Sequence, residues 1–124
     1  MGIYAEWLFP RLLDLVMRQK QIMPFRDRIG KAAAGCVLDV GIGSGVNLPY
    51  YGDAVKHLCG VDPSPRVAHR CERACNAPVP VEFVCSGAEA LPLDSKSIDN
   101  IALTFTLCTI GDPRAALVEM RRVA

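Results

Sequence analysis

The sequence predicts one α/β domain organised around a doubly wound parallel sheet. Apolar runs of strand length alternate with helical patterns, and we expect strands at 36–40, 56–61, 81–85 and 100–105. A glycine-rich segment directly follows the first of these strands, as in the turn that joins a strand to a helix in such sheets. With 124 residues, 51% of them hydrophobic, the chain is long enough to bury a single core.

Residues 1–35 precede the first strand, and we divide the chain into this N-terminal part and a domain at 36–124. Within the first part, residues 3–20 place apolar side chains at helical spacing, with Pro10 as a kink or a new start. Residues 21–35 are expected to form a solvated linker. Its basic side chains are Arg26, Arg28 and Lys31. A weak contact with a membrane surface or an anionic substrate is the alternative for this stretch.

Later helices have clear start signals. Ser64 precedes a proline, a combination typical of an N-cap followed by the first helical residue. Asp112 precedes a proline in the same way, at the start of a helix expected over 113–123. A short helix is also expected at 46–51, after the glycines.

The segment 37–47 carries the most specific signal in the chain and reads Val-Leu-Asp-Val-Gly-Ile-Gly-Ser-Gly-Val-Asn. Gly41, Gly43 and Gly45 let the backbone turn sharply and leave no side chain between the main chain and a ligand. Asp39 ends the strand; an acid there suits a ligand with an amine and a positive charge better than a pyrophosphate. A nicotinamide dinucleotide site is the alternative, but its fingerprint requires a glycine where Val46 stands.

This segment resembles motif I of the class I S-adenosylmethionine-dependent methyltransferases. From Leu38 to the C-terminus, the chain is similar to the type 11 methyltransferase domain, a group that contains the ubiquinone and menaquinone enzymes. Two segments, Asn-Leu-Pro-Tyr at 47–50 and Thr-Phe-Thr-Leu-Cys-Thr at 104–109, most resemble lipid-associated thiol methyltransferases. The resemblance implies a Rossmann-like sheet of strand order 3-2-1-4. It also implies S-adenosyl-L-methionine as cofactor and S-adenosyl-L-homocysteine as product.

The same resemblance implies which residues hold the cofactor. Asp39 is expected to receive the amine, and Asn47 to order the adjacent turn. Asp62, at the tip of the second strand, can accept hydrogen bonds from both ribose hydroxyls, with a helix-start cap as its alternative role. The other residues assigned to the cofactor are Pro63 beside the ribose, Gly87, Ala88 and Glu89 in the adenine loop, and Thr104, Phe105 and Thr106 along the methionine chain.

Two departures from the family's pattern bear on the chemistry. Many relatives carry an aspartate where Gly87 stands, so the Ala88 backbone or Glu89 is expected to hold the adenine amino group. Cys108 and Thr109 stand where quinone-type relatives often have two histidines, which points to a thiol or lipid acceptor. The expected reaction is in-line methyl transfer to a small-molecule thiol, lipid or quinone-like acceptor, and no catalytic base is identifiable.

The chain ends before the strands that complete the family's sheet, so we expect a C-terminally truncated domain, the cofactor-binding half of an enzyme. The strand at 100–105 would then be an exposed edge, able to pair with a second copy. A non-catalytic interaction module derived from the truncated fold is therefore an alternative function.

The bulk composition excludes few classes of function, but it favours a cytoplasmic protein. The net charge of +1 gives no argument for nucleic acid binding. The six cysteines show neither metal-ligand nor disulfide spacing, and we expect buried, reduced thiols. Residues 1–17 are too short and too charged to cross a bilayer, although the N-terminal helix could lie at a membrane surface.

Overall fold

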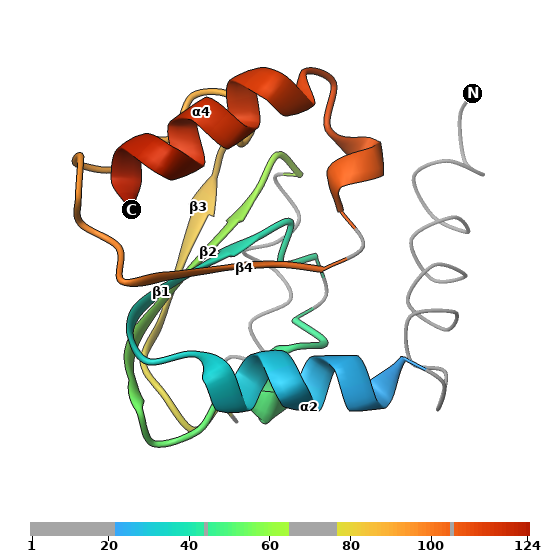
Figure 1. Ribbon diagram of the computed structural model, residues 1–124, viewed down its shortest axis with the longest axis vertical. Coiled ribbons are helices and arrows are strands. Elements are labelled where there is room, and N and C mark those ends of the chain that lie inside the picture. Colours follow the sequence, from blue (N-terminus) through green and yellow to red (C-terminus); the bar gives the residue numbers. More distant parts are fainter. Residues whose placement is uncertain (1–21, 44, 65–76, 105) are drawn as a thin grey trace.

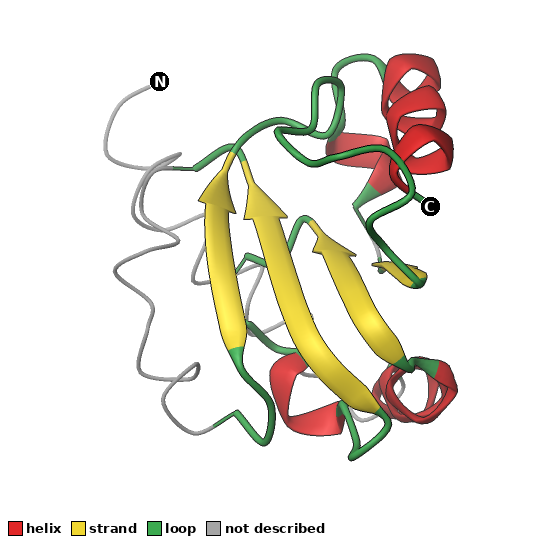
Figure 2. Cartoon of the chain, turned by 90° about the vertical axis from the view of Figure 1, so that its left-hand side faces the viewer, coloured by secondary structure: helices red, strands yellow, loops and turns green. Residues whose placement is uncertain are grey.

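The computed structural model describes residues 22–43, 45–64, 77–104 and 106–124. In these ranges the chain forms a parallel sheet of order β3-β2-β1-β4, which confirms the predicted order and the Rossmann-like architecture. Figure 2 shows the strands side by side. The elements in chain order are α2 (Met23–Ala32), β1 (Gly35–Val40), the 3-10 helix η2 (Leu48–Tyr50), β2 (Val55–Asp62), β3 (Val81–Cys85), β4 (Asn100–Leu103), the 3-10 helix η4 (Leu107–Thr109) and α4 (Pro113–Val123).

The two faces of the sheet bury separate apolar clusters because successive strand residues point to opposite sides. On one face, Val37 and Leu58 pack with Ile29 and Ala33 from α2 and its C-terminal end. On the other face, Leu38 and Val40 pack with residues of α4, namely Ala116, Met120 and Val123. Figure 1 shows α2 and α4 on opposite sides of the strands. The described helices therefore cover both faces, as a doubly wound sheet requires.

Strand β1 lies inside the sheet, between β2 and β4. Its register places small residues of both neighbouring strands beside Asp39. Asp39 pairs with Gly60 on β2 and with Ala102 on β4. A parallel sheet places the carboxyl ends of all its strands at one edge. The turn after β1, the end of β2 and the segment after β4 consequently meet there.

The strand limits agree closely with those predicted, with one informative exception. Strand β4 ends at Leu103 rather than at residue 105. Thr104 instead accepts hydrogen bonds with its backbone oxygen and its hydroxyl, from Thr106 and Asn47. Strand pairing thus ends at the point where Thr104 begins to contact residues near the glycine turn.

The expected linker at 21–35 is wrong over most of its length, because residues 23–32 form helix α2. Pro24 lies in its first turn, where a missing N–H costs nothing. Arg26, expected to be solvated, is only 5% exposed. The division of the chain at residue 35 remains a prediction, and the helix expected at 3–20 lies outside the described residues.

Helix α4 begins where predicted: the Asp112 side chain accepts a hydrogen bond of 3.1 Å from the backbone N–H of Ala115. The helix expected after Ser64 falls in residues that the structure does not describe. In the ranges it does describe, no helix has both the length and the apolar character needed to cross a bilayer.

The prediction of buried thiols is correct for only some of the described cysteines. Cys59 is buried, and burial raises the pKa of its thiol to about 11. Cys36 is half-buried, whereas Cys85 and Cys108 are exposed. None of these four cysteines is in a disulfide within the described part of the chain, while Cys71 and Cys75 lie outside it.

Candidate cofactor site

The glycine turn after β1 leaves space on the side where a ligand would lie. Gly41 and Gly43 both have positive φ, 70° and 53°, a region that side chains disfavour. A Cβ at Gly41 would lie 2.7 Å from the hydroxyl oxygen of Thr106, so this glycine is needed for close packing. Among the described residues that are not its chain neighbours, a Cβ at Gly43 would meet nothing nearer than the Gly41 carbonyl at 3.9 Å. Gly45 also has a positive φ of 75° and closes the turn through its N–H, which donates to the Ile42 carbonyl over 2.9 Å.

Asp62 lies at the end of β2 and holds the glycine turn from the neighbouring strand. One carboxylate oxygen accepts a hydrogen bond of 3.1 Å from the Gly43 N–H, and the other accepts one of 2.9 Å from the Ser64 N–H. The side chain therefore bridges the two turns and ties them together. Pro63, the next residue, is exposed beside it. Both residues are brought to the edge at which the sequence placed the ribose.

Asp39 is a buried carboxylate beneath the turn, 1% exposed. Its Oδ2 accepts hydrogen bonds from the Tyr51 hydroxyl at 2.7 Å and from the Asn47 amide nitrogen at 3.3 Å. Its Oδ1 is buried without a hydrogen-bond partner in the described structure. An unsatisfied carboxylate oxygen is costly to bury, so this atom marks a place where a donor is missing.

Burial raises the pKa of Asp39 from 3.8 to about 6, and the increase is limited by hydrogen bonds from Tyr51 and Asn47 and by the charge of Arg26. Burial and the adjacent carboxylate raise the pKa of Tyr51 strongly, so its proton stays on the phenol. At neutral pH, Asp39 is therefore mainly ionised and Tyr51 is a hydrogen-bond donor. The pair presents a negative charge below the turn.

Sequence reasoning missed Arg26 and Tyr51, which complete this network. The Arg26 guanidinium donates a hydrogen bond to the side-chain oxygen of Asn47. Arg26 was assigned to the linker because nothing local indicates its partner, 21 residues further along the chain. One signal could have found the helix that carries it: Pro24 at a helix start, followed by Ile29 and Ala33 at helical spacing.

The segment after β4 closes the other side of the turn. The Thr104 hydroxyl accepts a hydrogen bond of 2.9 Å from the Asn47 amide nitrogen, and Thr106 packs against Gly41. Both threonines are thus brought to the predicted site, together with Asn47, which is buried. Phe105 lies outside the described residues.

In the loop after β3, the Glu89 side chain lies beside Gly87, the position at which many relatives carry an aspartate. A Cβ at Gly87 would lie 2.5 Å from Oε2 of Glu89, so the Glu89 carboxylate fills the space that a side chain at position 87 would take. The other oxygen of Glu89 accepts a hydrogen bond of 3.4 Å from the Asp112 N–H. Ala88, which lies between Gly87 and Glu89 in the chain, is buried in the core.

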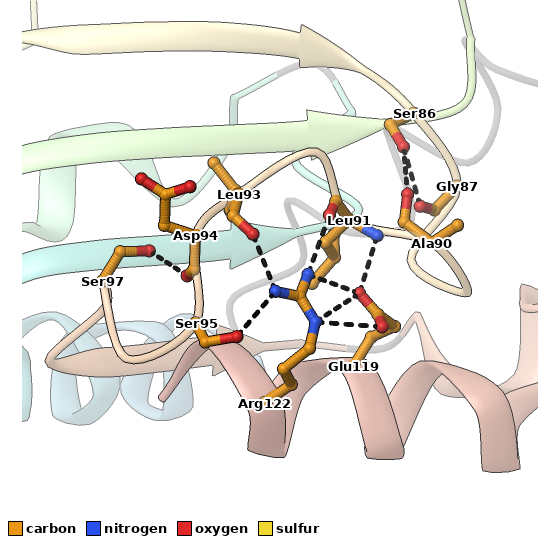
Figure 3. Close-up of polar contacts among 10 residues, drawn as sticks. All are labelled: Ser86, Gly87, Ala90, Leu91, Leu93, Asp94, Ser95, Ser97, Glu119 and Arg122. Carbon is orange, nitrogen blue, oxygen red and sulfur yellow. Dashed lines mark hydrogen bonds and ion pairs between the residues drawn. The ribbon is translucent and has the colours of Figure 1, made fainter.

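Helix α4 holds the continuation of this loop through an arginine, as Figure 3 shows. The Arg122 guanidinium donates hydrogen bonds of 2.9 Å to the carbonyl oxygens of Leu91 and Leu93, and one of 3.2 Å to the Ser95 hydroxyl. Glu119 accepts from the Leu91 N–H at 3.0 Å and pairs with Arg122 at 2.8 Å. We call Glu119 and Arg122 the α4 clamp.

The site therefore combines an open glycine turn, a buried carboxylate with one free oxygen, and a second acid at the end of β2. These groups fit a ligand that brings an ammonium group and a diol, because acids accept from both. They define an α/β domain that binds a small cofactor at the carboxyl edge of its sheet.

Comparison with known proteins identifies the family. Residues 38–124 match the family described as a methyltransferase domain, and the chain belongs to that family. The match gives no support to the dinucleotide alternative.

The curated relatives share moderate identity over part of their length. The demethylmenaquinone methyltransferase of Renibacterium salmoninarum is 32% identical over 97 residues, 78% of this chain and 40% of the relative. The thiol S-methyltransferase TMT1B of Mus musculus is 28% identical over 102 residues, 79% of this chain and 41% of the relative. The chain thus spans about two fifths of the length of these relatives.

A solved structure supports the fold. The crystal structure of a SAM dependent methyltransferase from Aquifex aeolicus superposes with a TM-score of 0.71 at 24% identity. The superposition covers 93% of this chain and 66% of that one.

Proposed function

We propose that this chain binds S-adenosyl-L-methionine and forms the cofactor-binding half of a methyltransferase that acts on a small-molecule acceptor. The observation that carries the proposal is the free, buried Oδ1 of Asp39 beneath a glycine turn whose Gly43 side is open. Membership of the methyltransferase-domain family supports the same function.

The proposed contacts follow from the donors and acceptors at this edge. Asp39 would receive the ligand's ammonium group through its free oxygen, and Asp62 would receive the ribose hydroxyls. Asp62 already accepts from two backbone N–H groups, which fixes its carboxylate in place for this task. Glu89 would receive the adenine amino group in place of the aspartate that many relatives carry. Gly41, Gly45 and Asn47 would shape the turn, and Pro63 would lie beside the ribose. Gly87 and Ala88 would belong to the adenine loop, and Thr104, Phe105 and Thr106 would lie along the methionine chain.

When bound, S-adenosyl-L-methionine supplies an activated methyl group on a sulfonium. The chain's own residues would then orient the ligand and keep water away from it. We propose a thiol, lipid or quinone-like acceptor, and the names of the relatives cover two of these classes, thiols and menaquinone precursors. A thiolate acceptor requires no protein base.

Calorimetric titration with S-adenosyl-L-homocysteine tests the proposal, with NADH as the comparison ligand. We expect saturable binding of S-adenosyl-L-homocysteine alone. Asp62→Ala should abolish this binding, whereas Asp53→Ala, at an exposed acid before β2, should not. Binding that survives Asp62→Ala unchanged would contradict the proposed site.

A second candidate function, a non-catalytic interaction module, is favoured by the position of β4. This strand pairs with β1 and stands at the end of the strand order, so its other edge has no ladder partner in the described sheet. Such an edge can pair with a second copy of the chain. Size-exclusion chromatography that gives a defined dimer independent of S-adenosyl-L-homocysteine, without methyl transfer to small thiols, would favour the module. An active monomer would exclude it.

We also propose a cytoplasmic location with weak contact to membrane surfaces. The described cysteines are not in disulfides, which supports a reducing compartment. Phe25 and Arg28 are exposed three residues apart on α2, a spacing that places an apolar and a basic side chain on the same side of the helix. Flotation with anionic vesicles should recover part of the protein, and Phe25→Ser should reduce that part.

A further inference from the structure

We propose that Arg26 is a positioning residue of the cofactor site. From α2 it fixes the Asn47 amide and keeps Asp39 in the charged state that a ligand's ammonium group requires. This inference rests on the proposed function, because it concerns the same site. It assigns a role to a helix that lies outside the glycine turn and outside residues 38–124, which match the family.

The packing of α2 brings Arg26 to the site. Val37 and Asp39 point to the same face of the sheet, since they are two residues apart on β1, and α2 covers that face. Gly30 lets the helix approach η2 closely: a Cβ there would lie 2.5 Å from the carbonyl carbon of Tyr50. Arg26 precedes Gly30 by four residues and so lies on the same side of the helix. Its side chain is consequently buried next to the turn.

The hydrogen bonds of Asn47 have one consistent direction. Arg26 can only donate, so its bond to Asn47 places the amide oxygen toward α2. The amide nitrogen then faces Asp39 and Thr104 and donates to both. A carboxylate can only accept, and the reverse orientation of the amide would set two acceptors against each other. Arg26 and Asp39 therefore fix together which way the Asn47 amide points.

The charge of Arg26 also acts on Asp39. The charged and titratable groups that face Asp39 from the described elements are Arg26 of α2 and Tyr51 after η2. Its neighbours on β2 and β4 are Gly60 and Ala102, which carry no charge. Burial favours the neutral acid; the hydrogen bonds from Tyr51 and Asn47 oppose it, and the guanidinium charge of Arg26 adds to their effect.

The free Oδ1 of Asp39 links this network to a ligand. Tyr51 and Asn47 both donate to Oδ2, and the other oxygen is buried with no partner. A carboxylate that Tyr51, Asn47 and the charge of Arg26 together keep ionised, and that is short of one donor, suits a ligand ammonium group. A neutral acid would attract it much less.

The test is calorimetric binding of S-adenosyl-L-homocysteine at pH 6 to 8.5, with 5′-methylthioadenosine as a comparison ligand that keeps the adenosine and the sulfur but lacks the amino-acid group with its amine. Arg26→Gln retains an amide donor for Asn47 but removes the charge. Loss of the charge raises the Asp39 pKa, so S-adenosyl-L-homocysteine should bind several-fold more weakly at pH 7 and approach wild-type binding at pH 8.5. Binding of 5′-methylthioadenosine should change little at any pH.

The controls separate a role in charge from a role in packing. Arg26→Lys keeps the charge and should keep the wild-type pH profile, and Arg28→Gln removes the same charge from an exposed position of α2. Arg26→Met provides a second uncharged variant, and thermal unfolding shows which variants are folded.

Two outcomes would overturn this inference and leave the proposed function standing. One is a wild-type pH profile in Arg26→Gln and Arg26→Met. The other is a loss that is equal at every pH and equal for both ligands. A wild-type chain that does not bind S-adenosyl-L-homocysteine would instead overturn the proposed function itself, and this inference with it.

Discussion

The Tyr51 hydroxyl donates a hydrogen bond of 2.7 Å to Oδ2 of Asp39, while Oδ1 of the same carboxylate is buried without a partner. The two oxygens of one acid are thus unequal: one is satisfied by the protein and the other is not. Such an arrangement lowers the stability of the free protein. It is typical of a group kept ready for a ligand.

Asp39→Asn should remove a pH-dependent cost. The pKa of Asp39 rises from 3.8 in the unfolded chain to about 6 in the fold, so its contribution is favourable below about pH 4 and is lost as the pH rises through 6. Relative to Asp39→Asn, wild type should lose roughly 2 kcal/mol of unfolding free energy between pH 4 and 7. Urea denaturation at several pH values measures this.

Asp53→Asn is the matched control, at an exposed acid, and should follow wild type. The Asp39→Asn chain should also fail to bind S-adenosyl-L-homocysteine while being the more stable protein at pH 7. A parallel pH dependence in wild type and Asp39→Asn would show that the buried carboxylate does not carry this charge cost.

Gly43→Ala should separate ligand binding from stability. The backbone at Gly43 has a φ of 53°, so alanine there costs roughly 1–2 kcal/mol of unfolding free energy. Among the described residues that are not its chain neighbours, the nearest atom to the added methyl group is 3.9 Å away, so the methyl projects into the proposed ligand space. S-adenosyl-L-homocysteine binding should therefore fall much more than stability.

Gly52→Ala serves as the control for Gly43→Ala, because a Cβ at Gly52 has nothing within 4 Å and its φ is not in the positive range. Unchanged binding in Gly43→Ala would show that the ligand does not bind against this turn. Calorimetry and urea denaturation on the same preparations provide both measurements.

The parts of the fold that the sequence predicted are those set by neighbours in the chain. Strand β1, its alternate glycines and the Asp112 cap depend on residues within a few positions of one another. The sheet order came from the family resemblance rather than from these local signals, and the structure agrees with it.

The parts that the sequence missed depend on tertiary contacts. Arg26 is buried because Gly30 lets α2 lie against Tyr50, and no local pattern specifies that contact. Strand β4 stops early because Thr104 bonds to Asn47, which is 57 residues away in the chain. Both errors occur at the site, where contacts between residues far apart in the chain decide the local structure.

Arg122→Ala should loosen the loop after β3. The guanidinium connects α4 to three successive points of that loop and also lowers the pKa of Glu119, which it contacts. A lowered carboxyl pKa stabilises the fold above about pH 4.5 and is lost at more acidic pH. Thermal unfolding at pH 7 should occur at a lower temperature, and the difference from wild type should shrink toward pH 3.

Arg121→Ala removes a charge from an exposed position on the same helix and should have little effect. Hydrogen exchange provides a local measurement: the Leu91 N–H, bonded to Glu119, should exchange faster in Arg122→Ala. Unchanged exchange at Leu91 would mean that the α4 clamp does not hold the loop.

Glu89→Ala should reduce the discrimination between purine rings. The Glu89 carboxylate fills the space beside Gly87 and would accept a hydrogen bond from the adenine amino group. S-inosyl-L-homocysteine carries an oxygen at that position and would face the carboxylate with a second acceptor. Wild type should prefer S-adenosyl-L-homocysteine by roughly tenfold or more, the worth of a hydrogen bond to a charged group.

Calorimetry with both ligands should show this preference largely lost in Glu89→Ala, but retained in Asp94→Ala, an exposed acid of the same loop. If Glu89→Ala weakens both ligands equally, the carboxylate supports the loop through the Asp112 N–H instead, and the backbone of Ala88 becomes the better candidate for the adenine contact.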